Sequence, residues 1–341
     1  MSLHKCPWVR SLAPQVRLRS VGAFAAMMTV TATLAIAITR MSTQWDDQEG
    51  HPIYLEEMGS VAVPDSFPVT GMAISRTGEV FLYSAAQPYV LHYDRGRLHN
   101  VGQGVLRRPV GIAAETGAGA FAVLDAGLRS VLLFKEGRVV ARQALRVENH
   151  LQIEDATRLR EFWFVLARDR SDNYIILKLL AGGGWQRMDG AARVLSRLTG
   201  LSRARLIATE GGVILMHRDP VLGTVVLSPT TGEQVVQFAL ANVGSASELG
   251  GSGGRWVSLW TVELGRYYLQ TLADLRSDRR ALVLFEPDGR VVRERVVDIP
   301  MGIGASASGL RLLAAVRRAG TQELVIYRWN SPAQLERSER R

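Results

Sequence analysis

Short apolar strands separated by glycine-containing polar turns recur along most of this chain, about every 41 to 57 residues. In each copy, a run such as Val-Leu-His-Tyr or Leu-Val-Leu-Phe leads into a turn and then into a second, valine-rich strand. The clearest copies are Val90 to Val101 around Gly96, Val131 to Arg142 around Gly137, Val225 to Phe238 around Gly232, and Leu282 to Val297 around Gly289. Such a period, filled with short strands and without long amphipathic helices, predicts a β-propeller whose blades share one core.

The repeats can be divided into six blades of four antiparallel strands, within residues 53–330. The first two blades, at about residues 68–102 and 109–147, align almost residue for residue, since Pro68-Val69-Thr70-Gly71 matches Pro109-Val110-Gly111 with one residue inserted. The later blades are looser, at about residues 151–189, 198–241, 244–298 and from 300 onward. Residues 267–280 of the fifth blade form an insertion for which we consider a short helix. A ring of five or seven blades is the alternative, because blades three and five are ambiguous.

The sixth predicted blade ends with residues 323–329 and lacks its outermost strand. Residues 53–63 precede the first full repeat and have strand character. We therefore predict that this N-terminal strand completes the last blade and closes the ring. Closure of this kind removes exposed sheet edges that would otherwise favour aggregation.

Residues 1–40 have the pattern of a signal peptide or signal anchor. Four basic residues precede residues 21–38, an uncharged run that contains Ala35-Ile36-Ala37, the small-x-small pattern of a cleavage site. A retained membrane anchor and a buried core helix are the alternatives. Whether the segment is a cleaved signal peptide or a retained anchor, its positive leader stays inside the cell, so the chain after Arg40 is expected to be extracytoplasmic. It would then be periplasmic, secreted, or anchored to the inner membrane by residues 21–38. The polar residues 41–52 are predicted to be a linker.

Cysteine content and charge narrow the possible partners. The sole cysteine, Cys6, lies in the leader, so the exported part cannot form an internal disulfide. The formal charge of +9 includes four basic and no acidic residues in positions 1–37, and the remaining basic residues are scattered. Residues 331–341 alternate arginine and glutamate, which is typical of a solvated tail. We expect no nucleic-acid partner, contact with a membrane only through an uncleaved N-terminal segment, and a monomer.

The segment from Phe121 to Phe134, with Asp125 and Gly127, resembles an NHL repeat, the unit of a class of six-bladed propellers. Residues 81–93 are similar, and the resemblance is clearest over residues 68–147. It departs from the family where Leu128 replaces a common asparagine and the following arginine is displaced. The resemblance implies a fold but does not select a function, because NHL-type propellers include binding scaffolds, lyases and lactone hydrolases.

Charged residues near the predicted inner strands are the candidate ligand contacts. Polar side chains from several blades converge on the axis at one mouth of a propeller. Two residues that lie two apart on a strand share a face, so a histidine and an aspartate of the fourth blade can both point to the channel. We expect ligand contacts at Asp155, Arg158, His217, Asp219, Glu263 and Arg317, with Arg160 close to the first two. The structural alternative for His217 and Asp219 is a polar turn before a proline, and for Asp125 a carboxylate that binds turn amides.

No motif for catalysis or metal binding is evident in the sequence. The glycines of residues 250–254 lack the Gly-Lys-Ser/Thr of a phosphate cradle, and residues 304–308 lack the second glycine of a hydrolase elbow. The spacings of zinc sites are missing. Trp163, Trp185, Trp256, Trp260 and Trp329 are expected to fill blade interfaces, with Trp185 the most exposed.

We therefore predict a binding module without a cofactor that recognises a protein or cell-envelope ligand through one mouth of the ring. The alternative is a metal-dependent lactone or ester hydrolase, or a lyase, of the calcium type with its site on the axis.

Overall fold

The computed structural model describes residues 54–180, 183–196, 204–209, 212–216, 224–238, 256–274, 280–297, 301–319 and 321–330. The chain divides into two units, Met1–Gly50 and His51–Arg341, and all described residues lie in the second. The predicted leader, the linker and the charged tail lie outside these ranges. Within the ranges, no helix has the length and apolar character needed to cross a membrane.

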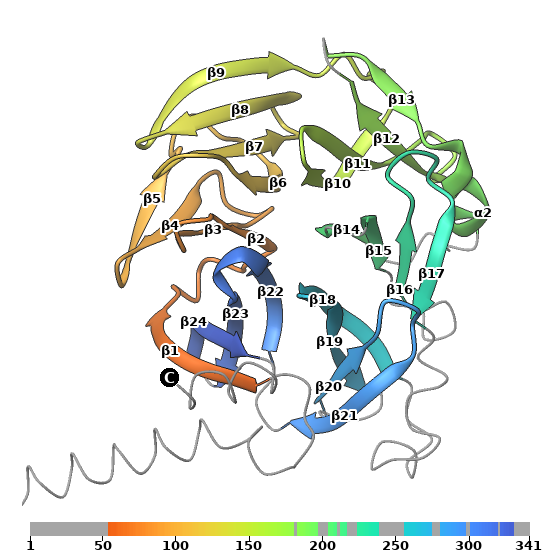
Figure 1. The fold of residues 1–341 in the computed structure, drawn as a ribbon. Coiled ribbons are helices and arrows are strands. Elements are labelled where there is room, and N and C mark those ends of the chain that lie inside the picture. Colours follow the sequence, from red (N-terminus) through yellow and green to blue (C-terminus); the bar gives the residue numbers. More distant parts are fainter. Residues whose placement is uncertain are drawn as a thin grey trace, which may run out of the picture. The chain divides into compact units, whose positions relative to one another are not determined.

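Six four-stranded antiparallel sheets are arranged as a ring of blades (Figure 1). Blade 1 contains β2 (Gly71–Ile74), β3 (Val80–Tyr83), β4 (Val90–Asp94) and β5 (Arg97–Val101); blade 2 contains β6 (Pro109–Ala114), β7 (Phe121–Asp125), β8 (Ser130–Lys135) and β9 (Arg138–Ala144); blade 3 contains β10 (Gln152–Leu159), β11 (Phe162–Arg168), β12 (Tyr174–Leu179) and β13 (Trp185–Arg187). In each of these three blades the first strand in sequence is the innermost. The predicted order of strands is therefore confirmed for the best-aligned repeats.

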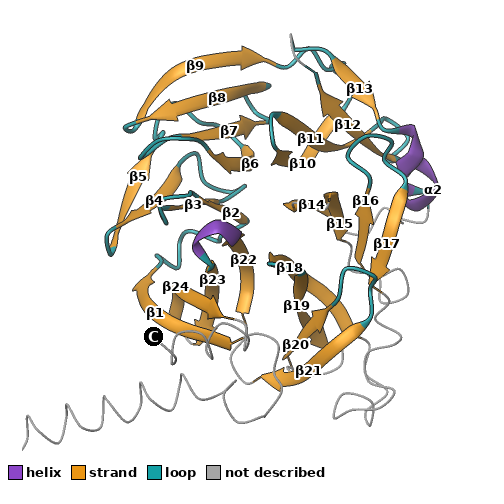
Figure 2. Cartoon of the chain, in the orientation of Figure 1, coloured by secondary structure: helices purple, strands orange, loops and turns teal. Residues whose placement is uncertain are grey.

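The other three blades follow the same plan, with the last blade built from both ends of the ring. Blade 4 contains β14 (Arg205–Thr209), β15 (Gly212–Met216), β16 (Thr224–Leu227) and β17 (Gln234–Phe238); blade 5 contains β18 (Trp256–Leu264), β19 (Tyr267–Asp274), β20 (Arg280–Phe285) and β21 (Val291–Val297); blade 6 contains β22 (Met301–Ala307), β23 (Leu312–Ala319), β24 (Thr321–Asn330) and β1 (Tyr54–Ala62). Strands dominate the described chain (Figure 2), and its short helical pieces are η1 (Asp189–Ala191), α2 (Ala192–Leu195) and η4 (Ser308–Leu310). The predicted count of six blades is confirmed.

The strand β1 closes the ring, as the sequence predicts. It pairs antiparallel with β24, from Tyr54 opposite Asn330 to Ala62 opposite Glu323. The side chain of Arg317 on β23 fastens this joint, because its Nη1 lies 3.0 Å from Glu57 Oε2 on β1. Its Nη2 also donates to the Glu323 carboxylate on β24, at 2.8 Å. Arg317 thus holds three strands of blade 6 together.

Glycine sets the geometry of the outer hairpins. In the turn between β4 and β5, Arg95 and Gly96 have φ of 47° and 81°, and in the turn between β8 and β9, Glu136 and Gly137 have φ of 50° and 76°. Two successive positive φ values are the mark of the type I′ turn, whose twist matches that of the flanking strands. The glycine turns of the first two blades are therefore tight hairpins.

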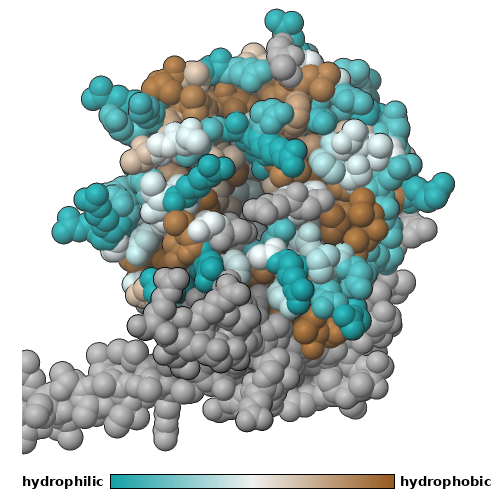
Figure 3. Space-filling model, viewed as in Figure 1, coloured by the Kyte–Doolittle hydropathy of each residue, from teal (hydrophilic) through white to brown (hydrophobic). Residues whose placement is uncertain are grey.

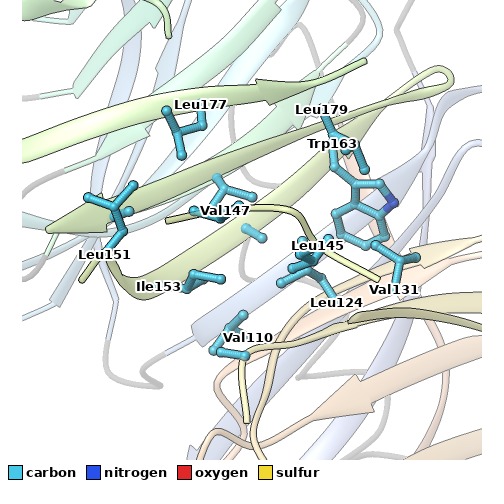
Figure 4. Close-up of a cluster of buried hydrophobic side chains, with 14 of the residues drawn as sticks. Val110, Leu124, Val131, Leu145, Val147, Leu151, Ile153, Trp163, Leu177 and Leu179 are labelled. Atoms are coloured by element: carbon cyan, nitrogen blue, oxygen red, sulfur yellow. The ribbon is translucent and has the colours of Figure 1, made fainter. Parts of the chain in front are cut away.

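The core lies between neighbouring blades. Phe81 of blade 1 stacks on Phe121 of blade 2 at a centroid distance of 4.6 Å, and Phe121 stacks on Phe134 at 4.8 Å. A second apolar cluster joins blades 2 and 3 around Leu124, Val131 and Trp163 (Figure 4). Each blade therefore buries its faces against its neighbours, which allows one ring to use a chain of this length.

Two expectations about single segments have opposite outcomes. The structural interpretation of Asp125 is confirmed, because this fully buried carboxylate accepts the backbone N–H groups of Arg107, Arg108 and Leu128 at 2.7, 3.1 and 2.8 Å. The helix considered within residues 267–280 is wrong for its described part, since residues 267–274 form the strand β19. All residues of β19 after the first are buried, so the segment shows no alternation that would identify a strand.

Candidate functional site

A cavity of about 870 Å³ lies on the axis of the ring. The six innermost strands β2, β6, β10, β14, β18 and β22 all contribute to its wall, together with residues that follow their ends. The face shown in Figure 3 is hollowed near the centre of the ring, beside hydrophilic residues. A cavity of this size is in the range of ligand-binding pockets.

A side chain crosses the axis at the level where the inner strands begin. Arg205, the first residue of β14 in blade 4, donates from Nη2 to the backbone carbonyl of Thr70 in blade 1. Its Nε also lies 3.2 Å from Oδ2 of Asp155 in blade 3. Because blades 1 and 4 are opposite each other in a ring of six, the contact between Arg205 and Thr70 has to span the channel.

The side chains of Tyr83 and Trp260 extend this set of contacts to all six blades. The Tyr83 hydroxyl lies 3.0 Å from the Val110 carbonyl of blade 2 and 3.3 Å from Asp155 Oδ1. The guanidinium of Arg205 lies 5.8 Å from the ring centre of Trp260 in blade 5, a cation–π contact. The indole N–H of Trp260 donates to the carbonyl of Gly304 in blade 6. We call Tyr83, Asp155, Arg205 and Trp260 the axial network.

Glycines in the inner strands make room for the axial network. A Cβ atom on Gly71 would lie 2.5 Å from Cε1 of Tyr83, so the aromatic ring can pass over β2 only because that position has no side chain. A Cβ atom on Gly111 would lie 2.5 Å from the carbonyl oxygen of Ala156, where the inner strands β6 and β10 approach each other. Glycine within a strand is typical of such close approaches.

Burial and mutual contacts fix the charge states in the axial network. Burial raises the pKa of the Asp155 carboxyl above its ordinary value, and the nearby Arg205 and the Leu206 amide offset part of this effect. Burial and the Asp155 charge raise the pKa of the Tyr83 phenol, so it stays protonated at neutral pH. Burial opposes the charge of Arg205, but Asp155 and Tyr83 hold its pKa above the ordinary value. The network is therefore a set of groups whose charges and dipoles compensate one another.

Charged residues gather where the inner strands end. We call Arg76, Glu115, Arg158, Arg160 and Glu263 the mouth rim; all five line the cavity. Arg158 forms an ion pair with Glu115 of the neighbouring blade. Burial lowers the pKa of the Arg158 guanidinium, an effect that Glu161 partly offsets.

Two arginines of the mouth rim are exposed and uncompensated. Arg76 follows β2 in blade 1 and Arg160 follows β10 in blade 3. Neither has an ion-pair or hydrogen-bond partner among the residues that the structure describes. The Nε atom of Arg158 is buried and also lacks a hydrogen-bond partner within the described ranges. The rim thus offers positive charge and donors to a ligand.

The structure brings together part of the site expected from the sequence. Arg158 and Glu263 line the cavity, and Asp155 lies in the axial network rather than at the mouth. Arg317 is not among the residues that line the cavity, because it belongs to the second strand of its blade and holds the ring closed. His217 and Asp219 lie outside the described residues, as do the glycines of residues 250–254.

Sequence reasoning missed Arg76, Tyr83 and Arg205. The only signal for Arg205 is a charged residue directly before the apolar run Leu206-Ile207-Ala208, at the start of an inner strand. Nothing local to the sequence indicates that this side chain reaches the opposite blade. Among the described residues, no group of three or more histidine, cysteine, aspartate or glutamate side chains is placed to hold a metal ion.

Comparison with known proteins shows the fold and no family. No protein-family model matches the chain, and no curated protein sequence matches it. Among solved structures, the PQQ-bound form of aldose sugar dehydrogenase from Streptomyces coelicolor is similar with a TM-score of 0.51 and 11% identity, covering 82% of this chain and 100% of that one.

Virginiamycin B lyase from Staphylococcus aureus has a TM-score of 0.48 and 8% identity, covering 81% of this chain and 99% of that one. The Cps50 (Swd1) β-propeller domain from Myceliophteria thermophila has a TM-score of 0.47 and 11% identity, covering 80% of this chain and 99% of that one. The similarity to the aldose sugar dehydrogenase agrees with the β-propeller fold. The resemblance to NHL repeats stays a prediction.

Proposed function

We propose that this protein is an exported β-propeller binding module that recognises a protein or cell-envelope ligand at the mouth rim. The observation that carries the proposal is the axial cavity itself, which is walled by all six inner strands, bordered by charged residues and crossed by the axial network. Because Arg205 of blade 4 contacts the Thr70 carbonyl of blade 1, this side chain obstructs the channel at one end. A ligand therefore enters and leaves on the rim side.

The chemistry of the site favours binding over catalysis. In the axial network, Oδ2 of Asp155 accepts the Leu206 N–H at 2.7 Å and also faces Arg205, while Oδ1 faces the Tyr83 hydroxyl. Asp155 is buried and both of its oxygens face donors of the protein, so the carboxylate is not accessible to a substrate. The most exposed groups of the rim are Arg76 and Arg160, and arginine recognises anions rather than transferring protons.

Photocrosslinking in the producing cells tests the proposal. The full chain carries p-benzoylphenylalanine at position 160 on the rim or, as a matched control, at position 138 on the outer strand β9, where Arg138 is exposed. We expect a crosslinked adduct of defined mass from position 160 and none from position 138. No adduct from 160, together with turnover on a panel of lactones or esters, would reject the binding module and favour the enzymatic alternative.

Export is part of the same proposal and has a separate test. Its support is the basic leader followed by the uncharged residues 21–38. Mass determination of the protein from cell fractions distinguishes a cleaved chain from an anchored one. Full-length protein found only in the cytosolic fraction would contradict export and leave the site proposal intact.

A further inference from the structure

The mouth rim is suited to a particular class of ligand, and this inference rests on the proposed binding function. We propose that it binds an acidic peptide segment in which two carboxylates flank an apolar side chain. The carboxylates pair with Arg76 and Arg160, and the apolar side chain enters the cavity between them.

The positive charge on the rim exceeds the negative charge that faces it. Glu115 is engaged by Arg158, while Arg76 and Arg160 have no acidic partner among the described residues. Arg158 keeps a buried Nε–H without an acceptor in the described chain, so a bound anion would also satisfy this donor. Guanidinium groups bind carboxylates with paired, charge-assisted hydrogen bonds. The rim is therefore complementary to more than one anionic group.

The backbone at Arg160 allows a test that separates a ligand role from a structural one. In the turn that follows an inner strand, blades 1 and 5 have glycine at positive φ, with Gly78 at 87° and Gly265 at 62°. Blades 3 and 6 have arginine there instead, with Arg160 at 56° and Arg311 at 53°. Glycine adopts the left-handed conformation freely, whereas a residue with a Cβ atom adopts it at some cost in tight turns. Glycine is therefore expected to replace Arg160 without loss of the fold.

Part of the cavity wall is apolar. Ile74, Leu159, Ile207 and Val262 line the cavity, and Leu310, which is 40% exposed, lies at its edge. An exposed leucine beside an open cavity is a contact that an apolar ligand group can cover. The ligand that fits this wall has an apolar group to bury as well as charges to pair.

The positions of the arginines favour a ligand with two separate anionic groups. Arg76 belongs to blade 1 and Arg160 to blade 3, so the whole of blade 2 lies between them. A ligand with two anionic groups can pair with each arginine without requiring both side chains to converge on one point. A peptide carries acidic groups on both sides of an apolar side chain at adjustable spacing, which matches this arrangement.

Calorimetry on the full chain tests the inference with short blocked peptides. In one series two glutamates flank a leucine at varied spacing; in the control peptides glutamine replaces the glutamates or serine replaces the leucine. We expect binding of at least one glutamate–leucine peptide that weakens with added salt, and no comparable binding of the controls. Arg76→Gln and Arg160→Gln should each weaken binding about tenfold, the loss expected for one charge-assisted pair. Arg138→Gln, which removes the same charge from the outer strand, should have no effect.

A glycine variant separates a ligand role from a structural one. Arg160→Gly should weaken peptide binding as much as Arg160→Gln while its unfolding midpoint stays unchanged or rises, because the backbone strain is relieved. A marked fall in the midpoint would assign Arg160 to the fold and overturn its role as a ligand contact.

Three results would overturn the ligand class. These are equal binding of the glutamine peptides, competition by inorganic phosphate at the affinity of the peptide, and binding to phosphatidylglycerol vesicles without binding to any peptide. If position 160 crosslinks to a cellular partner but no peptide binds, the ligand class is wrong and the binding module stands. If neither occurs, both proposals fail.

Discussion

Replacement of Arg205 by methionine tests the claim that the contacts of this side chain on the axis, including its salt bridge with Asp155, stabilise the ring. Methionine keeps an unbranched apolar stem and removes the charge. The change takes away the cation 3.2 Å from Asp155, the donor to the Thr70 carbonyl and the contact with the Trp260 ring. Asp155, which is only 3% exposed, is then left without a counter-charge.

The expected loss of stability follows from the burial of the pair. Removal of one partner from a buried ion pair typically costs about 3–5 kcal/mol. The side chain of Arg205 is 27% exposed, so water screens part of the interaction and the lower limit of about 3 kcal/mol applies. For a domain of this size, roughly 2–4 °C of unfolding midpoint corresponds to 1 kcal/mol, which gives a fall of about 6–12 °C.

The pH dependence of this loss identifies its cause. Burial already raises the pKa of Asp155, and removal of Arg205 should raise it further. A folded carboxyl with a raised pKa binds a proton at a pH where the unfolded one has released it, so lowering the pH stabilises the folded state. The deficit of Arg205→Met relative to the wild type should therefore shrink between about pH 7 and about pH 5.

The cause can be identified from thermal unfolding, at both pH values, of the wild type, Arg205→Met and the double variant Arg205→Met/Asp155→Asn. In the double variant with Asp155→Asn, the carboxyl is gone and the extra pH dependence should disappear. A deficit below about 1 kcal/mol would show that solvent compensates the pair, as it does for exposed salt bridges. A deficit that is the same at both pH values would show that lost packing, rather than an uncompensated charge, is responsible.

Three further predictions concern the ring. Gly71→Ala should lower the free energy of unfolding measured in urea by about 2 kcal/mol, because the new Cβ atom would lie 2.5 Å from the ring of Tyr83. Gly59→Ala is the control and should have little effect, because nothing lies within 4 Å of its Cβ position. Similar losses in the two variants would contradict the steric argument. Asp125→Ala should cost about 2–4 kcal/mol, since three backbone amides lose their acceptor, and hydrogen exchange should increase first in blade 2 rather than uniformly. Burial raises the pKa of the Tyr327 phenol from 10.0 to about 12, despite the opposing effect of Arg317. The protein should lose stability as the pH rises through this range, because the phenol ionises first in the unfolded chain. The same loss in Tyr327→Phe would rule out this group as the cause.

Local patterns were enough to predict most of the fold. The glycine turns at Gly96 and Gly137 and the matching segments of the first two blades depend only on neighbouring residues. The closing strand was predicted from residues 53–63, and the structure has β1 at Tyr54–Ala62. Local reasoning failed at β19, where both faces of the strand are buried and the usual alternation is absent.

The candidate site was less predictable because it is created by ring closure. Arg205 and the Thr70 carbonyl that it contacts are 135 residues apart, and only the closed ring makes their blades opposite each other. Arg317 was expected on the axis, but its strand is second in its blade and its charge is used by Glu57 and Glu323. Arg158 and Glu263 were found because the sequence repeat already indicates which strands are innermost.

Closure of the ring by β1 and β24 has a consequence for how the protein is made. Glu57 and the Arg317 guanidinium that it binds are separated by 260 residues, and the ribosome produces β1 long before β24 exists. The nascent segment around Glu57 therefore has no pairing partner until almost the entire propeller has been synthesised. Contacts of such long sequence separation form late and slowly. Completion of the ring therefore has to wait until β24 has been synthesised, and any truncation that removes β24 also releases β1.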